Sequence, residues 1–296
     1  MTDINGKIAF VSGGASGIGL AMAQAFAKRG ARVAIADIDF DLARRQAALI
    51  DGAAAIELDV TSEDSWQMAA ETTRRALGPV SILCNNAGVG GGSGKLEEYD
   101  PEIWRWVYSV NVHALLYSAR TFVPDMKASG TRCHIVNTAS MVALVPTPNS
   151  IAYVASKFAT LGISFGMRNE FEGFDIGVSV LCPGMTATRI VQTTGRLRPD
   201  NRNNALTDER MKTMHDILQT GMRPESVGEM VARAVEGDEF YVLPSPEWKP
   251  MVEGHFSDIL SGFREPAQPG HSDDLTSFLK AWNKTEMFGY RIPDAP

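Results

Sequence analysis

The sequence predicts an α/β fold in which one doubly wound parallel sheet carries helices on both faces. Short runs rich in β-branched residues alternate with helix-length segments whose apolar residues recur at helical spacing. Parallel strands need a crossover that passes over the sheet, so this alternation favours βαβ units. A chain of 296 residues with 44% hydrophobic content can bury one large core, which favours a single domain over two.

Four expected strands alternate with three expected helices in the first part of the chain. The strands share short apolar runs, and we place them at 8–12, 32–36, 54–58 and 81–84. The helices share apolar residues three or four positions apart, and we place them at 19–29, 39–49 and 65–77. Gly30 ends the first helix, as glycine commonly does just beyond a helix.

The alternation continues after residue 100 and is then interrupted. Helices are expected at 101–126 and 153–172, and strands at 134–138, 177–181 and 240–243. Residues 186–223 form a long insertion with one apolar helix face, made of Met211, Met214, Ile217, Leu218 and Met222. That methionine-rich face is typical of ordinary core or of a subunit contact, and equally of an adaptable pocket wall.

We place the end of the main domain, residues 1–243, after the last expected strand. Residues 244–296 form a C-terminal extension that is too short and too rich in proline to be a second domain. Within the extension we expect an amphipathic helix that carries the apolar residues Met251, Phe256, Ile259, Leu260 and Phe263.

The charge and the apolar runs exclude several kinds of partner. A net charge of -7 and a pI of about 5.3 give a surface that repels phosphate backbones, so nucleic acid is not expected. No run of 18 or more apolar residues predicts a membrane span, and the N-terminus lacks the pattern of a signal peptide. We expect a cytoplasmic protein.

The cysteines and histidines favour neither disulfides nor a metal. Cys84, Cys133 and Cys182 lie in or beside apolar runs, as buried thiols do, and a reducing compartment fits them best. The five histidines form no H-E-x-x-H or Cys/His ligand pattern. We expect no metal site.

A glycine-rich turn, Ser-Gly-Gly-Ala-Ser-Gly-Ile-Gly, joins the first strand to the first helix. In this position backbone N–H groups and the helix N-terminus can meet a pyrophosphate. Glycines alone would fit a plain flexible loop equally well, so other residues must decide. The turn residues that we assign to a dinucleotide are Gly13, Ser16, Gly17, Ile18 and Gly19.

Asp37 closes the second strand, roughly 20 residues beyond the turn, where a carboxylate can accept hydrogen bonds from the adenosine ribose. It would repel a 2′-phosphate, and neither Ser16 nor Ile38 is basic, so NAD is favoured over NADP. Asp59, followed by Val60, ends the third strand. Its carboxylate could bond the adenine amino group or could cap the next turn.

Tyr153 and Lys157 are four residues apart in an expected helix, so both side chains lie on one face. A neighbouring ammonium group stabilises a phenolate and can bring a tyrosine into the range of a useful proton-transfer group. The Tyr-x-x-x-Lys spacing alone is common, and an aromatic core residue next to a solvated lysine would explain a lone match.

These pieces together resemble the short-chain dehydrogenase/reductase family, over roughly residues 5–243, and its Rossmann-type fold. The order and separation of the motifs match throughout the chain. The matching residues are the glycine turn, Asp59-Val60, Asn85-Asn86-Ala87-Gly88, Asn111, Ser140, Tyr153-Val154-Ala155-Ser156-Lys157, Pro183-Gly184 and Thr188.

The resemblance implies a catalytic role for four residues. Tyr153 would exchange a proton with the alcohol oxygen, and Ser140 would hydrogen-bond the same oxygen. Lys157 would lower the pKa of Tyr153 and bond the nicotinamide ribose. Asn111 would hold a water that links Lys157 to solvent, although an asparagine in a helix can also satisfy a local backbone group.

The resemblance also implies further cofactor and subunit contacts. Thr188 would bind the nicotinamide carboxamide, and the helices that bear Asn111 and Tyr153 would form a homodimer or homotetramer. The remaining cofactor positions lie beside the adenosine or after the sixth expected strand, and they are Asn86, Ala87, Gly88, Pro183 and Gly184.

The end of the chain departs from many family members, because a long tail follows the strand at 240–243. This ending and the insertion are similar to dehydrogenases that oxidise the benzylic alcohol of lignin-derived aryl ethers. We therefore expect a bulky, aromatic alcohol or ketone as substrate. The expected substrate contacts are Ser140, Met141, Val142, Tyr153 and Met185.

Two alternatives stay open. The same hydride chemistry could serve a steroid, a sugar or another alicyclic alcohol, whereas the acidic charge disfavours an acyl-carrier substrate. A non-catalytic module that only binds NAD would be attractive if Ser140, Tyr153 or Lys157 were missing, and all three are present.

Overall fold

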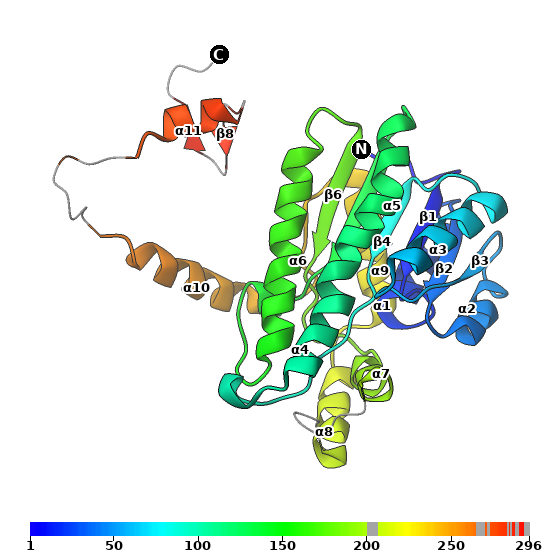
Figure 1. The fold of residues 1–296 in the computed structure, drawn as a ribbon, viewed down its shortest axis with the longest axis horizontal. Helices are drawn as coiled ribbons and strands as arrows, with labels where there is room; N and C mark the ends of the chain where they lie inside the picture. The colour runs from blue at the N-terminus through cyan, green and yellow to red at the C-terminus, as the bar shows by residue number, and fades with distance from the viewer. Residues whose placement is uncertain are drawn as a thin grey trace. The chain divides into compact units, whose positions relative to one another are not determined.

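The computed structural model divides the chain into two compact units, Met1–Val252 and Glu253–Pro296. The first unit holds a seven-stranded sheet of order β3-β2-β1-β4-β5-β6-β7 (Figure 1). The expected α/β fold with a doubly wound parallel sheet is confirmed. The residues that the structure describes are 1–199, 207–264, 270, 273–282, 284, 286–287 and 290–292.

All neighbouring strands of the large sheet pair in parallel. The strands are β1 (Ile8–Ser12), β2 (Arg32–Asp37), β3 (Ala54–Glu57), β4 (Ile82–Asn85), β5 (Cys133–Thr138), β6 (Ile176–Leu181) and β7 (Tyr241–Val242). The order reverses where β1 lies between β2 and β4. In an open parallel sheet this reversal leaves a crevice at the carboxyl ends of the strands, where ligands bind.

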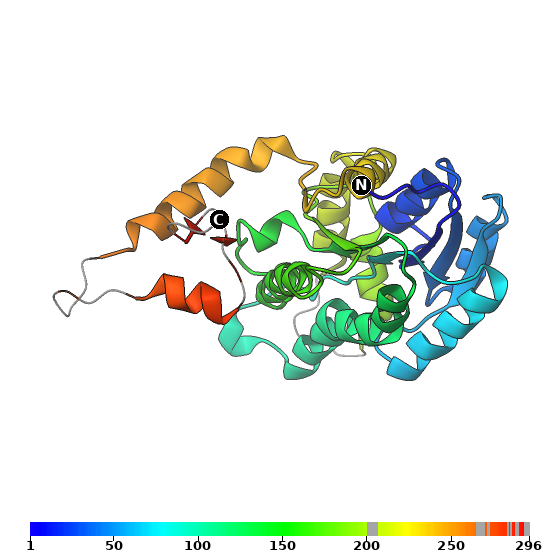
Figure 2. The ribbon, with the colours of Figure 1, turned by 90° about the horizontal axis from the view of Figure 1, so that it is seen from above.

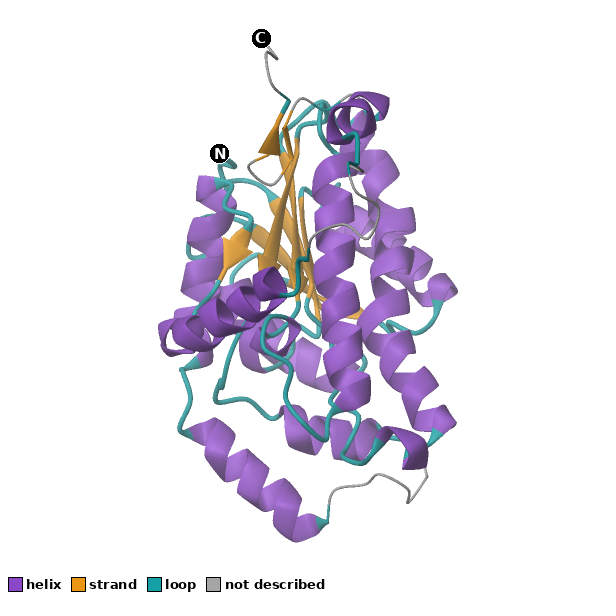
Figure 3. Ribbon diagram, turned by 90° about the vertical axis from the view of Figure 1, so that its left-hand side faces the viewer, coloured by secondary structure: helices purple, strands orange, loops and turns teal. Residues whose placement is uncertain are grey.

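Helices cover both faces of the sheet (Figures 2 and 3). One apolar cluster joins the sheet to α3 (Glu63–Ala76), α5 (Ala114–Ala128) and α6 (Ile151–Glu170). The opposite cluster joins it to α1 (Gly17–Ala27), α2 (Phe40–Ala47) and α9 (Pro224–Gly237).

Alternation along β1 shows how the sequence fills both layers. Phe10 packs in the first cluster, with its ring centroid 5.9 Å from that of Trp66 and 4.9 Å from that of Phe122. The next residue, Val11, packs in the second cluster, which also contains Met22. Since side chains alternate across a strand, a strand buried on both faces is apolar throughout.

The helix expected at 101–126 contains a change of winding. It begins as α4 (Pro101–Tyr108), continues through the π-helical turn η2 (Ser109–His113) and becomes α5. A π turn inserts one residue into the helical repeat and is frequent at functional sites. It contains Asn111, which is buried.

The insertion after β6 is closed at its base. Thr186 and Met222 form a parallel β-bridge, and the Met222 N–H donates to the Met185 carbonyl at 3.0 Å. Two helices follow one another within it, α7 (Ile190–Leu197) and α8 (Asp208–Gln219). Residues 200–206 of the predicted insertion lie outside the described residues.

The remaining elements are short or belong to the C-terminal region. Single 3-10 turns are η1 (Leu96–Glu98), η3 (Met141–Ala143) and η4 (Pro246–Trp248). The C-terminal elements are α10 (Lys249–Ser261), α11 (Leu275–Ala281) and an antiparallel pair, β8 (Glu286–Met287) and β9 (Tyr290–Arg291). The apolar residues expected on one amphipathic helix lie on α10 and are exposed, except that Phe263 lies beyond its end. Among the described residues, no helix is long and apolar enough to cross a membrane.

Candidate active site

The glycine turn packs directly against the loop that follows β4. Gly13 has a φ of +61°, and a Cβ there would stand 2.9 Å from the Cα of Ala87. The Asn86 side-chain amide donates to the carbonyls of Ser12 and Gly13, at 3.1 and 3.3 Å. Only glycine satisfies both the left-handed backbone and this close approach.

The start of α1 opens onto a cavity of about 550 Å³. Ser16 is the N-cap residue of α1, and its side chain caps none of the first N–H groups. Those N–H groups and the positive end of the helix dipole suit an anionic ligand. Gly19 does not line the cavity. A Cβ at Gly19 would stand 2.2 Å from the Gly13 carbonyl oxygen, so this glycine allows the helix to pack closely against the turn.

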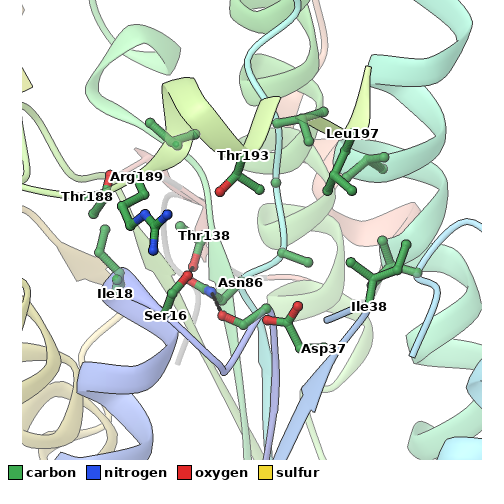
Figure 4. A pocket seen from close by; sticks show the side chains of 18 of the residues that line it. Ser16, Ile18, Asp37, Ile38, Asn86, Thr138, Thr188, Arg189, Thr193 and Leu197 are labelled. Atoms are coloured by element: carbon green, nitrogen blue, oxygen red, sulfur yellow. Dashed lines mark hydrogen bonds between the residues drawn. The ribbon is translucent and has the colours of Figure 1, made fainter. Parts of the chain in front are cut away.

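Asp37 lies at the far end of this cavity, beside Ile38 (Figure 4). Its carboxylate accepts the Ala15 N–H at 3.1 Å and the Asp39 N–H at 3.0 Å, which ties β2 to the glycine turn. Burial raises the pKa of Asp37, and these two backbone hydrogen bonds oppose the rise. The carboxylate is therefore held at a fixed place on the cavity wall.

Asp59 lines the same cavity and also shapes its own turn. One carboxylate oxygen accepts both the N–H and the hydroxyl of Thr61, at 2.9 and 2.7 Å. The turn role considered from the sequence is therefore present in the structure. The second carboxylate oxygen makes no hydrogen bond to another described residue.

Most of the expected cofactor residues meet in this one cavity. Those that line it are Gly13, Ser16, Gly17, Ile18, Asp37, Asp59, Val60, Asn86, Ala87, Gly88, Tyr153, Lys157, Pro183 and Thr188. Gly184 lines a neighbouring cavity instead. Asp39 and the α7 region also line the cavity and were not predicted from the sequence. The α7 region adds Arg189, Thr193 and Leu197 (Figure 4), together with Arg196.

The catalytic pair lies in the first two turns of α6. The Lys157 ammonium donates to the Thr138 carbonyl at 2.8 Å and stands 5.6 Å from the centroid of the Tyr153 ring. The Ser140 side chain, two residues beyond the end of β5, lies close enough to the Tyr153 hydroxyl to affect its pKa. The structure therefore brings Ser140, Tyr153 and Lys157 together at the carboxyl end of the sheet.

Burial dominates the ionisation of this pair. It raises the pKa of Tyr153, and the hydrogen bond with Ser140 opposes that rise. It lowers the pKa of Lys157 to about 8. The sequence spacing predicted a lowered pKa for Tyr153, and the structure gives the opposite direction because spacing carries no information about desolvation.

Asn111 fixes the loop after β4 to α6. Its amide oxygen accepts the Val89 N–H at 2.9 Å, and its amide nitrogen donates to the Val89 carbonyl and the Ser156 hydroxyl, at 2.9 and 3.0 Å. A Cβ on Gly88 would stand 3.3 Å from the Lys157 nitrogen and 3.4 Å from the Asn111 amide oxygen. Gly88 thus leaves the space between these two groups open.

A second cavity of about 990 Å³ begins at Ser140 and Tyr153. Met141, Val142 and Met185 also line it, so all five residues expected to contact the substrate are found there. Residues of α7, α8 and the segment after β7, which were not predicted from the sequence as substrate contacts, complete the wall of this cavity. They are Ile190, Thr194, Met211, Met214, Leu218 and Trp248. Tyr153 lines both cavities.

The pattern that describes short chain dehydrogenases matches residues 7–198, which include the glycine turn and the whole catalytic constellation. The chain belongs to the short-chain dehydrogenase family. The sequence-based assignment to this family is therefore confirmed, and the protein is an oxidoreductase.

Individual members of the family resemble this chain over nearly its full length. A Cα-dehydrogenase of Sphingobium is 30% identical, with 97% of each chain covered, which confirms the expected similarity to this subgroup. A 1-deoxy-11β-hydroxypentalenate dehydrogenase of Streptomyces exfoliatus is 35% identical, with 94% of this chain and 97% of the relative covered. A short-chain dehydrogenase/reductase of Burkholderia phymatum, solved in complex with NAD, is 30% identical with a TM-score of 0.83, covering 92% and 100% of the two chains.

Proposed function

We propose that this protein is an NAD-dependent dehydrogenase that interconverts a secondary alcohol and its ketone. The observation that carries the proposal is the position of Tyr153, whose side chain lines both the dinucleotide cavity and the second cavity. A residue at this junction can exchange a proton with a substrate held beside a nicotinamide ring. Bound NAD would supply the hydride acceptor, and NADH the donor.

The chain's own residues supply the proton and the orientation. Ser140, a residue that is 7% exposed, would use its hydroxyl to hold the alcohol oxygen next to the Tyr153 hydroxyl. Tyr153 would take the proton during oxidation and return it during reduction. The Lys157 ammonium, anchored on the Thr138 carbonyl, would offset the negative charge that forms on Tyr153.

Asp37 and the similarity to an NAD complex both support NAD over NADP. The Asp37 carboxylate is fixed on the cavity wall by two backbone N–H groups and would repel a 2′-phosphate. The Burkholderia phymatum relative was solved with NAD. At Gly13 any side chain would collide with Ala87, so the bare backbone of the turn is free to approach a pyrophosphate.

The second cavity supports a bulky substrate. Its volume of about 990 Å³ lies at the upper end of the range for small-molecule sites. Four methionines contribute to its wall, Met141, Met185, Met211 and Met214. Methionine walls adapt to large apolar groups. Together with the similarity to a Cα-dehydrogenase, these features favour the benzylic alcohol of a lignin-type aryl ether.

A second candidate is an alicyclic alcohol. The hydroxypentalenate dehydrogenase of Streptomyces exfoliatus is similar at 35% identity, and the apolar wall around Met211 and Leu218 would suit fused rings as well as aryl groups.

A panel of secondary alcohols tests the function and separates the two candidates. NADH formation is followed by absorbance with benzylic aryl-ether alcohols, steroid and other alicyclic alcohols, and sugars, each with NAD and with NADP. We expect the highest kcat/KM with NAD and a benzylic alcohol. Preference for an alicyclic substrate would select the second candidate, and absence of turnover across the panel would contradict the proposed activity.

A further inference from the structure

The charged residues of the dinucleotide cavity can be assigned to partners one by one. Three carboxylates and three cations line it: Asp37, Asp39, Asp59, Lys157, Arg189 and Arg196. The carboxylates accept backbone N–H groups, which lie in their own turns or, for Asp37, also in the glycine turn. Lys157 donates to the Thr138 carbonyl, and Arg196 forms an ion pair with Asp39 at 3.1 Å. Within the described part of the chain, the Arg189 guanidinium makes neither a hydrogen bond nor an ion pair.

Arg189 lies beside the start of α1. It precedes α7 directly, and its neighbour Thr188 sits so close that a Cβ on Gly17 would stand 3.2 Å from the Thr188 methyl group. Figure 4 shows the guanidinium directed into the cavity, toward the segment that bears Ser16 and Ile18. A flexible cation from the insertion therefore faces the helix N-terminus across the cavity.

We infer that Arg189 binds the cofactor's pyrophosphate from the side opposite the glycine turn. The inference rests on the proposed dinucleotide function and adds a ligand from the insertion to it. The pyrophosphate is the charged part of NAD, and Arg189 is the cation of this cavity whose charge no other described residue engages. A guanidinium matches phosphate oxygens with two parallel N–H donors.

The position of Arg189 would also link the insertion to the bound cofactor. Arg189 is the N-cap residue of α7, whose Thr194 accepts the Gly90 N–H at 2.8 Å and also lines the second cavity. A pyrophosphate held by Arg189 would fix the first turn of α7, and α7 contributes to the walls of both cavities. Cofactor binding would thereby complete the substrate pocket.

Equilibrium binding of three ligands tests the inference without turnover. Calorimetry would measure NADH, ADP-ribose, which carries the pyrophosphate, and adenosine, which lacks it. The proteins are the unaltered chain, Arg189→Gln, Arg189→Lys and the control Arg105→Gln, since Arg105 is an exposed residue of α4 that lines neither cavity. Thermal unfolding checks that each variant is folded.

Loss of a charge-assisted contact weakens binding by roughly tenfold to a hundredfold. We expect Arg189→Gln to weaken NADH and ADP-ribose by this factor, to leave adenosine unchanged, and to reduce the salt dependence of binding. Arg189→Lys should recover part of the affinity, and Arg105→Gln should match the unaltered chain.

Two results would overturn the inference while leaving the proposed function intact. One is ADP-ribose binding by Arg189→Gln that equals that of the unaltered chain, and the other is an equal loss for adenosine, which would indicate a general distortion. If the unaltered chain itself binds no NADH, the proposed function fails, and the inference fails with it.

Discussion

At the scale of single residues, chemistry depends on what burial does to each charge. Tyr153 and Lys157 are both buried. Burial raises the pKa of Tyr153 and lowers the pKa of Lys157, so it favours the neutral form of each group. A bare tyrosine in this place would be a poor base. Its usefulness therefore depends on Ser140 and on the ammonium group one helical turn away.

Asp37 is the residue on which the cofactor preference depends. The Ala15 and Asp39 N–H groups bond different oxygens of Asp37, so asparagine keeps an acceptor for one of them and removes the negative charge. We expect Asp37→Asn to reduce the preference for NAD over NADP by roughly tenfold, because a charge repulsion of about 1.4 kcal/mol is lost. Dissociation constants of both cofactors measure this.

The control for Asp37→Asn is Asp41→Asn, an exposed carboxylate on α2 that pairs with Arg44 outside the cavity. It should leave both dissociation constants unchanged. An unaltered NAD to NADP ratio in Asp37→Asn would show that another group sets the preference.

At the scale of elements, the alternation of strands and helices was predictable because each strand is short and apolar and several of the helices begin at a capping residue. Ser62, for example, accepts the Ser65 N–H and marks the start of α3. The π turn at Ser109–His113 was not predictable, because one inserted residue hardly alters an apolar period. It matters, since it contains Asn111.

β5 and β6 also bury a titratable group that the chemistry does not use. The His134 ring bonds the Ser179 hydroxyl at 2.8 Å and is fully buried, 3.6 Å from the Asp238 carboxylate. Burial lowers the pKa of His134 to about 4. The folded protein therefore holds a neutral imidazole, whereas the unfolded chain takes up a proton near pH 6.5.

This difference predicts a pH dependence of stability. The contribution of neutral His134 to the free energy of unfolding is fully present above pH 6.5. It is lost as the pH falls toward 4, at about 1.4 kcal/mol per pH unit. His134→Gln should flatten the slope of the unfolding free energy between pH 6.5 and 4 by that amount, measured by urea denaturation. His113→Gln, at an exposed position, should keep the original slope. Equal slopes in all three proteins would contradict the assignment.

At the scale of the Met1–Val252 unit, the sheet gathers residues from distant parts of the sequence at its carboxyl edge. The glycine turn and Asp37 could be named from the sequence because each follows a strand directly, and the catalytic pair because of its Tyr-x-x-x-Lys spacing within a helix. Arg189 and Trp248 could not, since the insertion and the segment after β7 reach the cavities only through tertiary packing.

The same unit exposes a large apolar side chain on each of two helices, α5 and α6, that we predict to form subunit contacts. α5 and α6 lie side by side in Figures 1 and 2, and Leu116 and Phe158 on them are 58% and 40% exposed. We expect a homodimer or homotetramer, with a mass by light scattering at least twice the 32.1 kDa of one chain.

Charge placed at these two positions should break the assembly. We expect the double variant Leu116→Glu, Phe158→Glu to have the mass of one chain, because an apolar interface cannot solvate carboxylates. Leu49→Glu, at a position that is 79% exposed just beyond α2, is the control and should leave the mass unchanged. A single-chain mass for the unaltered protein would refute the assignment.

The central claim is that Tyr153 transfers the proton at the junction of the two cavities. Its most direct test compares Tyr153→Phe with the unaltered chain in turnover of the best alcohol and in NADH binding. We predict a loss of kcat of roughly 10²- to 10⁴-fold, with an NADH dissociation constant that stays within about threefold, because only the hydroxyl is removed. Turnover by Tyr153→Phe close to that of the unaltered chain would contradict the account.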